Sequence, residues 1–411
     1  MIFKSYPKYI PCSIQWFTEI PQGWKEVRVE QYLVKKDENI GSLWSSTQLL
    51  SLTQKGVIEK DINDGKGKTH SDYSTYQAID KGDLVFCLFD IDETPRTVGL
   101  STKKGMITSA YTAFKSKENI NTQYVYYFFE SLDDAKALKP YYKGLRKTVR
   151  PPEFLKIHVP FPPKEEQDVI SKFLDSETSR IDNLIAKQEK LIELLEEQRK
   201  SIISHAVTKG LNPNAPMKDS GVEWLGEVPE HWKIGRLKNL LSINNGSDYK
   251  EFEVENSENS YPVYGSGGVF TYSSKYIYDQ ESVLLGRKGT INKPLYVTSP
   301  FWAVDTMFYS QVKQGVHGKY VYYQALGFPY DRYSSNTALP SMTQTDLLNL
   351  SVAIPIISEQ IEITQFLDNE NTMFDNLISK QKKLIEKLKE YRASIISHAV
   401  TGKIDVREFG A

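Results

Sequence analysis

The hydrophobic pattern of two long segments is typical of helices that pack against each other. In residues 162–209, and again in residues 355–402, apolar side chains return at alternating steps of four and three positions. This spacing places them on one stripe of a helix, which is the contact seam of a coiled coil. Neither segment has a Pro or Gly in its interior. Each is therefore predicted to be one helix of about 44 residues, roughly 65 Å long at 1.5 Å per residue.

The seam contains polar residues at matched places in the two segments, Gln188 in the first and Gln381 in the second. They are either the solvated edge of the stripe or buried groups that fix the register at some cost in stability. The pattern leaves open whether the helices run parallel or antiparallel. The residues that we place on the seam are Leu174, Leu184, Gln188, Leu191 and Leu195, and Leu367, Leu377, Gln381, Leu384 and Leu388.

The two segments are copies of each other, which predicts an internal repeat. Residues 162–208 and 355–401 align without a gap at an offset of 193, and 29 of the 47 positions are identical. Two further blocks repeat ahead of them. One begins at Trp16 and Trp224 with an offset of 208, and the other is the Tyr-Val-Tyr-Tyr motif at Tyr124 and Tyr320 with an offset of 196. The ends of each copy are thus fixed while the interior varies, which predicts two related units with different targets.

Between the repeated blocks, short β-rich runs alternate with Gly and Asn turns, which predicts mixed α/β domains of ordinary size. The predicted fold class is α+β: two globular α/β domains separated by a pair of long coiled-coil helices, with an internal pseudo-two-fold repeat. The predicted boundaries are residues 1–161 for the first domain, 162–209 for the first helix, 210–221 for a linker, 222–354 for the second domain, 355–402 for the second helix and 403–411 for a tail.

Composition narrows the class of protein. Lys and Arg number 51 and Asp and Glu 52, so a uniformly basic coat for nucleic acid is excluded, although local basic patches are not. The longest apolar runs are far shorter than the roughly 20 residues that a membrane helix needs. The N-terminal residues lack the pattern of a signal peptide, and the cysteines, Cys12 and Cys87, are too few for a disulfide framework. We expect a soluble, multidomain protein of a reducing compartment.

Local basic runs are the candidate sites for DNA. Residues 135–152 contain six basic residues and no acid, and residues 282–304 contain three basic residues and no acid around two glycines. Cations and backbone amides in such loops can bind phosphate, and Arg or Asn can read base edges. Taken alone, either loop is more simply read as a solvated loop. The candidate DNA-binding residues are Lys143, Arg146, Lys147, Thr148 and Arg150 in the first domain, and Arg287, Lys288, Asn292 and Lys293, with a polar loop at Ser335, Asn336 and Thr337, in the second.

Signatures of catalysis are absent from the sequence. Gly67-Lys68-Thr69 resembles the end of a phosphate-binding loop, but Ile62 stands where that loop needs a Gly. We find no His or Cys spacing for zinc and no cluster of acids and Lys for a nuclease. The repeated His205 and His398 lie at the predicted helix ends, and we interpret both as structural. We therefore expect no catalytic residues, no metal site and no bound cofactor in this chain.

Three repeated motifs together resemble the specificity (S) subunit of type I restriction-modification enzymes. They are the Trp-x-x-Glu-(Ile/Val)-Pro-x-x-Trp opening, the Pro-x-x-x-Glu-Gln helix entry at Pro162 and Pro355, and the Arg-x-x-Ile-Ile-Ser-His-Ala-Val-Thr helix exit. The resemblance extends from about Ile14 to Thr401. Gly144–Arg150 in the first domain and Asn336–Pro340 in the second resemble two recurring elements of this family.

The resemblance implies a function and partners. Two target recognition domains would each read one half of a split site in double-stranded DNA, and the two helices, running antiparallel, would set the distance between them and dock two methyltransferase subunits. Catalysis would belong to the partners, which would use S-adenosylmethionine for adenine methylation and ATP with Mg for cleavage by a restriction subunit. The location would be cytoplasmic, with no membrane contact.

Three alternatives to this interpretation remain open at the level of sequence. The chain could be a coiled-coil scaffold whose end domains bind proteins, or an enzyme with its site hidden in a divergent interior. It could also be a specificity subunit of a complex that only methylates and has no restriction partner. Charge reversal in the basic loops would separate the DNA interpretation from the scaffold, because only DNA binding depends on those cations.

Overall fold

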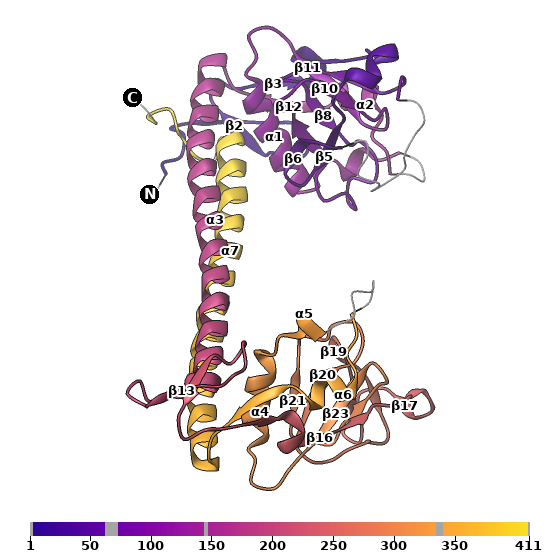
Figure 1. Ribbon diagram of the computed structural model, residues 1–411. Coiled ribbons are helices and arrows are strands. Elements are labelled where there is room, and N and C mark those ends of the chain that lie inside the picture. The colour runs from indigo at the N-terminus through magenta and orange to yellow at the C-terminus, as the bar shows by residue number, and fades with distance from the viewer. Residues whose placement is uncertain (1–2, 62–72, 144–146, 334–339, 410–411) are drawn as a thin grey trace. The chain divides into compact units, whose positions relative to one another are not determined.

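The structure is a computed structural model that describes residues 3–61, 73–143, 147–333 and 340–409 (Figure 1). Contacts within the chain divide it into two compact units. Unit 1 consists of Met1–Lys187 and Leu384–Ala411, and unit 2 is Gln188–Lys383. Each unit therefore contains one globular domain and about half of each long helix, whereas the boundaries predicted from sequence set each helix apart from the domains.

Two long helices account for the repeated segments. Helix α3 spans Lys164–Lys209 and helix α7 spans Ile357–Val400, 46 and 44 residues respectively. Both begin just after a proline-containing segment and carry acids in the first turn, Glu166 in α3 and Glu359 in α7, where the positive end of the helix dipole stabilises negative charge. The predicted pair of long helices is confirmed.

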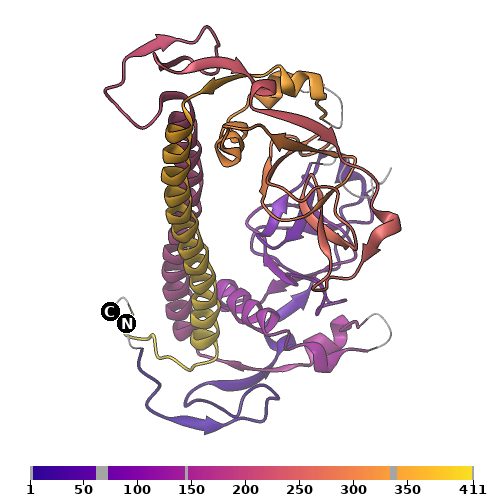
Figure 2. The same cartoon turned by 90° about the horizontal axis from the view of Figure 1, so that it is seen from below.

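The helices pair in the antiparallel sense within each unit. In unit 1, Leu174 near the start of α3 and Ile395 near the end of α7 are buried in one apolar cluster. In unit 2, Ile203 near the end of α3 and Leu367 near the start of α7 share another cluster. The two helices lie side by side in Figures 1 and 2. The question of direction that the hydrophobic pattern left open is thus answered by these contacts.

The contact seam departs from the predicted heptad positions in the middle of each helix. Leu191 and Leu384 were both placed on the seam, yet they are 39% and 40% exposed. Ile385, the next residue along α7, is only 8% exposed. A straight helix has 3.6 residues per turn, so its buried stripe drifts by about 20° per heptad away from a strict 3.5-residue repeat. After several heptads the residue one position later faces the partner helix.

The remaining predicted seam positions differ in burial according to their place along the helix. Leu174 and Leu367, which lie near the globular domains, are fully buried. The others are half-buried: Leu184, Gln188, Leu195, Leu377, Gln381 and Leu388.

The centre of each globular domain is an antiparallel four-stranded sheet with the same strand order in both units. In unit 1 the order is β4 (Leu33–Lys35), β11 (Thr112–Ser116), β8 (Leu84–Phe86) and β9 (Val98–Leu100). In unit 2 it is β16 (Leu241–Asn245), β23 (Met307–Val312), β20 (Ser282–Gly286) and β21 (Leu295–Val297). The internal repeat inferred from sequence therefore extends to the divergent interiors, where the residues themselves no longer match.

Smaller elements surround these sheets. Those of unit 1 are β1 (Tyr9–Pro11) with β2 (Glu19–Pro21), β3 (Lys25–Arg28) with β12 (His158–Phe161), β5 (Leu50–Thr53) with β6 (Gly56–Glu59), β7 (Gln77–Ile79) with β10 (Gly105–Ile107), and the helices α1 (Thr122–Asp134) and α2 (Pro151–Leu155). Those of unit 2 are β13 (Met217–Asp219) with β14 (Glu227–Pro229), β15 (Lys233–Arg236) with β24 (Ser351–Ile354), a second sheet of β17 (Glu253–Val254), β19 (Gly268–Ser273), β18 (Tyr261–Gly265) and β22 (Trp302–Ala303), and the helices α4 (Gly318–Leu326), α5 (Tyr330–Tyr333) and α6 (Gln344–Leu348).

The repeated Tyr-Val-Tyr-Tyr motif attaches each domain to the long helices. The last tyrosine of the motif donates a hydrogen bond to an aspartate on the helix that follows its own domain: Tyr127 to Asp175 at 2.8 Å and Tyr323 to Asp368 at 2.5 Å. The first tyrosine, Tyr124, is fully buried, and its hydroxyl lies 3.4 Å from a carbonyl oxygen near the end of α7. The motif thus fixes the position of each domain on the helix pair of its own unit.

Both long helices end at a glycine in the left-handed conformation, Gly210 with φ of 74° and Gly402 with φ of 72°. Such a residue stops a helix and turns the chain, and glycine adopts it without strain. A Cβ at Gly402 would overlap Pro21, and one at Gly210 would lie 3.2 Å from the ring of Trp232. The backbone conformation therefore favours glycine at both positions, and close packing requires it at Gly402.

Candidate DNA interface

The loops that carry the candidate residues of unit 2 leave the central sheet at one edge. The register pairs Asn245, the last residue of β16, with Phe308, and Gly286, the last residue of β20, with Met307. The end of β16, the end of β20 and the start of β23 therefore lie together. The loops that follow residues 245 and 286, and the loop that precedes residue 307, form one polar surface.

The predicted basic loop of unit 2 is held against the segment that follows the predicted polar loop. The amide of Gly289 donates to the carbonyl of Pro340 at 2.9 Å, and the amide of Met342 donates to the carbonyl of Arg287 at 3.0 Å. A β-bridge joins Lys288 to Ser341. The structure thus brings the basic loop beside residues 340–342. Ser335, Asn336 and Thr337 lie outside the described residues.

The basic side chains of this loop differ in how they are held. The Arg287 guanidinium donates to the carbonyl oxygen of Asp305 at 3.1 Å, which fixes its direction. The side chains of Lys288, Asn292 and Lys293 are exposed. An exposed cation is suited to bind phosphate, while an arginine held in place can be aimed at a base edge.

The structure adds polar residues that sequence reasoning did not single out. Gln344, at the start of α6, donates to the side-chain oxygen of Asn245 at 3.2 Å, and both lie at the same edge as the basic loop. Asn and Gln are the side chains that pair with adenine in the major groove. The signal in the sequence was an Asn-Asn-Gly run at residues 244–246 directly after a β-rich stretch, which is also what any turn would show.

In unit 1 two of the predicted basic residues, Lys143 and Lys147, are paired with acids. Lys147 has a positive φ of 44°, and its Nζ lies 3.1 Å from Asp92 Oδ2 and 3.0 Å from Glu93 Oε1. The hydrogen bond from Lys147 lowers the pKa of Asp92. Lys143 Nζ lies 3.4 Å from Glu153 Oε1. The run that is uniformly basic in sequence is therefore partly neutralised in the fold.

The remaining members of this run are placed by backbone contacts. The amide of Val149 donates to the carbonyl of Leu88 at 2.8 Å, which ties the run to the loop after β8. The backbones of Lys143 and Thr148 bond to each other, at 3.0 and 3.3 Å. Arg150 is exposed directly ahead of α2. Arg146 lies outside the described residues.

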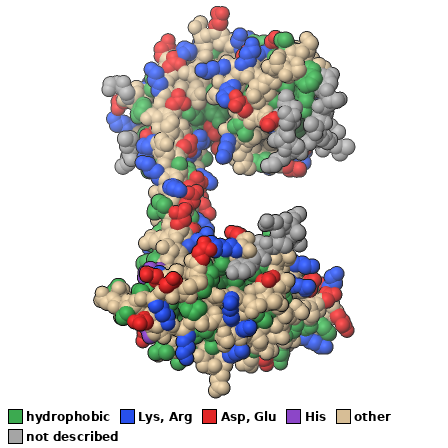
Figure 3. Space-filling model, viewed as in Figure 1, with side chains coloured by type: hydrophobic (Ala, Val, Ile, Leu, Met, Phe, Trp, Pro, Cys, Tyr) green, Lys and Arg blue, Asp and Glu red, His purple; other side chains and the backbone are tan. Residues whose placement is uncertain are grey.

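Equivalent loops carry opposite charge in the two units. The loop after β8 in unit 1 contains Asp90, Asp92 and Glu93, whereas the loop after β20, at the same place in the sheet order, contains Arg287 and Lys288. Overall, acidic and basic side chains are interspersed on the face of each unit that Figure 3 shows. At this edge of the shared four-stranded sheet, the two units thus differ in the charge of equivalent loops.

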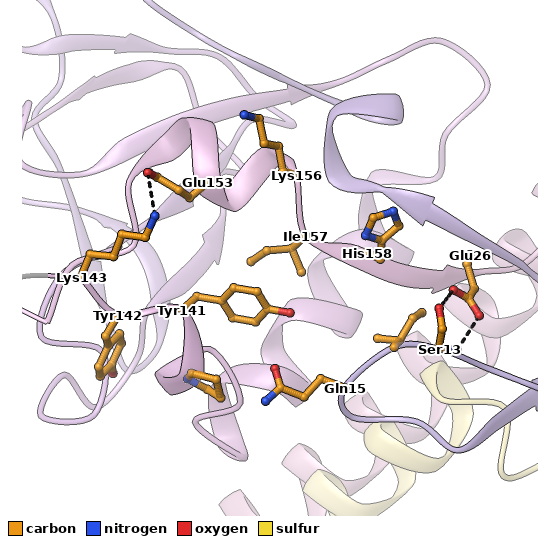
Figure 4. Close-up of a pocket in the computed structure, with 12 residues that line it drawn as sticks. Ser13, Gln15, Glu26, Tyr141, Tyr142, Lys143, Glu153, Lys156, Ile157 and His158 are labelled. Atoms are coloured by element: carbon orange, nitrogen blue, oxygen red, sulfur yellow. Dashed lines mark hydrogen bonds and ion pairs between the residues drawn. The ribbon is translucent and has the colours of Figure 1, made fainter.

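A pocket of about 500 Å³ lies beside Lys143 in unit 1 (Figure 4). The Tyr141 ring points into it, and Lys143 and Lys156 contribute cations to its wall. At its other end Ser13 donates to Glu26 through both its amide, at 2.7 Å, and its hydroxyl, at 2.6 Å. These hydrogen bonds lower the pKa of Glu26. The pocket therefore extends the candidate surface with the aromatic rings of Tyr141 and Tyr142 and with charges of both signs.

Within the described part of the chain, no group of three or more His, Cys, Asp or Glu side chains is arranged to hold a metal ion. Within the same residues, no helix is long and apolar enough to cross a membrane. Both cysteines are free thiols.

Two domains with one sheet plan, different loops at the same edge and a shared pair of antiparallel helices define a duplicated recognition protein. Residues 72–196 and 229–390 match the type I restriction modification DNA specificity domain. The matched ranges include most of both units, and the chain belongs to this family. The family is one of specificity subunits, and the relationship favours DNA recognition over a protein-binding scaffold.

Individual relatives agree with this assignment. The chain is 26% identical over 335 residues to the type I restriction enzyme MjaVIII specificity subunit of Methanocaldococcus jannaschii, covering 74% of this chain and 76% of the relative. It is 24% identical over 389 residues to the putative type I restriction enzyme MjaX specificity subunit of the same organism, covering 88% and 86%.

Solved structures show the same fold. A chain from a structural study of complex assembly and conformational transition of the type I R-M system superposes with a TM-score of 0.71 at 14% identity, covering 94% of this chain and 99% of that one. The HsdS subunit from Thermoanaerobacter tengcongensis gives a TM-score of 0.55 at 14% identity, covering 96% and 100%. Both likenesses support the α+β architecture with two domains and paired long helices.

Proposed function

We propose that this chain is the sequence-recognition subunit of a type I restriction-modification complex, in which each domain reads one half of a bipartite site in double-stranded DNA. The observation that carries the proposal is the shared sheet order of the two domains combined with different chemistry at one edge. In unit 1 the loop after β8 contains acids that pair with Lys147. In unit 2 the equivalent loop, which follows β20, contains Arg287 and Lys288. One scaffold with two sets of contact residues is what two half-sites of different sequence require.

In this proposal the long helices have two roles. They set the spacing between half-sites, because a helix of more than 40 residues without Pro or Gly in its interior resists bending. Their outward faces dock two methyltransferase subunits. Those subunits use S-adenosylmethionine, and restriction subunits that join the complex use ATP and Mg. This chain contributes recognition and no catalytic residue, and the complex works in the cytoplasm.

The near-neutral charge of the chain is consistent with DNA binding in which the partner subunits supply part of the positive charge. Phosphate contacts by Lys and Arg supply much of the affinity of any DNA-binding protein. With 51 basic and 52 acidic residues, this chain has little net attraction for DNA. We expect weak non-specific binding by the chain alone and specific binding once the methyltransferase subunits add their own cations.

Sequencing of methylated bases tests the proposal directly. DNA from cells that express this chain with its cognate methyltransferase should carry methyladenine at one split sequence. Replacing Arg287 and Lys288 by Ala should weaken recognition of one half-site and leave the other unchanged, because the two domains read separately. Methylation by the purified chain alone, or the loss of both half-sites together, would contradict the proposal.

A further inference from the structure

Phe173 of α3 is covered by two aromatic rings from the two terminal segments of the chain. The rings of Phe3 and Phe409 meet it edge-on, with centroids 5.5 and 4.9 Å away, and Phe173 is only 1% exposed. The amide of Asp405 donates to the carbonyl of Lys4 at 2.7 Å, which holds the two segments together (Figure 2). Unit 1 thus uses two chain segments to cover one aromatic residue of the helix.

The equivalent phenylalanine of unit 2 is partly exposed to solvent. Phe366 of α7 stands 193 positions after Phe173 and is 38% exposed. Here one continuous linker, residues 210–221, takes the place of the two terminal segments of unit 1, and it contains no aromatic residue. Leu211 of this linker is itself 40% exposed. One segment without a large ring does not cover the surface that two segments with Phe3 and Phe409 cover.

The exposed phenylalanine lines a cleft of about 500 Å³ between α3 and α7 of unit 2. Its walls include Ile202, Ala206 and Leu211, with Gly210 at the helix end and His205 beside them. The cleft is therefore mainly apolar and large enough for an aromatic side chain, which gains free energy from burial and from edge-to-face contact with another ring.

A carboxylate close to the same site has lost the partners that its counterpart has. In unit 1, Glu166 accepts hydrogen bonds from Trp24 Nε1, at 3.0 Å, and from the Tyr6 hydroxyl. The guanidinium of Arg407, two residues before Phe409, lies over the Tyr6 ring at 4.9 Å. Arg407 is also paired with Asp405 of the same tail, so unit 1 packs the Phe409 ring on Phe173 and holds this cation beside Tyr6.

In unit 2 the counterpart of Glu166 is Glu359, and the counterpart of Trp24 is Trp232. Glu359 lies 3.0 Å from His231, and the buried Trp232 Nε1 has no hydrogen-bond partner among the described residues. A Cβ at Gly210, which lines the cleft, would lie 3.6 Å from Glu359 Oε1. The carboxylate is thus at the edge of the apolar cleft, where it complements a cation.

We infer that this cleft binds an aromatic side chain with a neighbouring cation, presented by the methyltransferase subunit that docks on the helices. The inference rests on the proposed function for the identity of the partner. A second copy of this chain is a poorer occupant, because its own Phe3 and Phe409 are already packed on Phe173. We expect the bound segment to resemble the tail of unit 1, which has an aromatic residue and a cation two positions apart.

A peptide of the tail sequence is the first probe. A fluorescein-labelled peptide of residues 402–411 should bind the full chain in a polarisation assay. Phe366→Ala in the chain, or Ala in place of Phe409 in the peptide, should each weaken binding at least about tenfold. Leu326→Ala, which removes another exposed apolar side chain of unit 2, is the matched control and should leave binding unchanged. Absence of binding, or equal binding by the Phe366→Ala chain, would overturn the inference.

Assembly with the cognate methyltransferase is the second measurement. Phe366→Ala should weaken that assembly at least about tenfold, while circular dichroism and DNA binding by the isolated chain stay as in the wild type. Equal assembly of wild type and variant would contradict this inference but would not contradict the proposed function. Failure of the wild-type chain itself to assemble would instead refute the proposed function.

Discussion

Arg392 of α7 donates a hydrogen bond to Asp182 of α3 in unit 1, with 3.0 Å between Nε and Oδ1. Arg199 and Asp375 occupy the same two positions in the other copy of the repeat, and their Nη2 and Oδ1 atoms are 2.6 Å apart in unit 2. The helices exchange donor and acceptor between the copies, as antiparallel pairing of two equivalent helices requires. The repeat was visible in the sequence, but this pair of ion pairs was not.

The two arginines should differ in their effect on stability. Arg392 also lies 3.2 Å from Glu130, whose side chain is only 3% exposed, whereas the acid that pairs with Arg199 is 70% exposed. Arg392→Ala leaves a buried carboxylate short of a partner and should cost about 1–3 kcal/mol. Arg199→Ala removes a pair whose acid is exposed and should cost less than about 1 kcal/mol. Denaturant unfolding of both variants measures the difference, and equal costs would contradict it.

The cost of Arg392→Ala should also depend on pH. Burial raises the pKa of Glu130, and Arg392 opposes this by stabilising the charged form. The arginine therefore contributes stability when Glu130 is ionised and little when it is protonated. The difference in free energy of unfolding between wild type and variant should be largest at neutral pH and should shrink as the solution is acidified through the pKa of Glu130. A difference that stays constant down to pH 4 would contradict this role.

Release of Lys147 from its acids should strengthen DNA binding. Asp92→Asn with Glu93→Gln removes the two carboxylates that hold the Lys147 ammonium, so the cation becomes available to phosphate. We expect tighter non-specific binding and a slope of log Kd against log salt concentration that is steeper by about one phosphate contact, or roughly 0.9. Adding Lys147→Ala to the double variant is the control and should abolish the gain. Binding titrations at several salt concentrations provide the test, which fails if the slope is unchanged.

The helix-ending glycines should tolerate alanine less well than an open glycine with the same backbone conformation. Gly402→Ala adds a clash with Pro21 to the cost of a left-handed backbone and should destabilise by about 2 kcal/mol or more. Gly221 has φ of 66° and nothing within 4 Å of a Cβ, so Gly221→Ala should cost only about 1 kcal/mol. Thermal unfolding separates the two, and a smaller loss at Gly402 would contradict the packing argument.

A change in helix length should change the DNA spacing. Seven residues inserted into both α3 and α7, directly after Gln188 and Gln381, keep the helix seams in step and lengthen each helix by roughly 10 Å. The gap between methylated half-sites should grow by about three base pairs, given 3.4 Å per step. Insertion into one helix alone should break the match of the seams and reduce stability. An unchanged gap with both insertions would show that the helices do not set the spacing.

The periodicity of the sequence predicted the long helices because a helix of this length repeats its apolar stripe many times. It misplaced Leu191 and Leu384, because a heptad frame accumulates error along a helix with 3.6 residues per turn. The strands were harder to place, since most are only three to five residues long and carry little pattern. The repeated tyrosine motif was visible, but its bonds to Asp175 and Asp368 depend on tertiary contact.

For the candidate DNA-binding residues, too, the sequence predicts some features and leaves others to tertiary contact. Runs of basic residues could be read from the chain, whereas the neutralisation of Lys147 could not, because Asp92 and Glu93 lie more than 50 residues upstream. The side chains of Gln344 and Asn245 meet at the sheet edge although almost 100 residues separate them. The local sequence shows where charged residues occur along the chain. The order of the strands in the sheet is needed to show which of these residues lie close together.

The closure of unit 1 by the two ends of the chain has a consequence for synthesis on the ribosome. Unit 2 is one continuous stretch that is complete once residue 383 has emerged, whereas unit 1 needs residues 384–409 to cover helix α3. The domain that is translated first therefore finishes folding last. A nascent chain interrupted between these points would have a complete second domain and a first domain in which Phe173 lacks the cover of Phe409, and such exposed apolar surface makes a folding intermediate prone to aggregation.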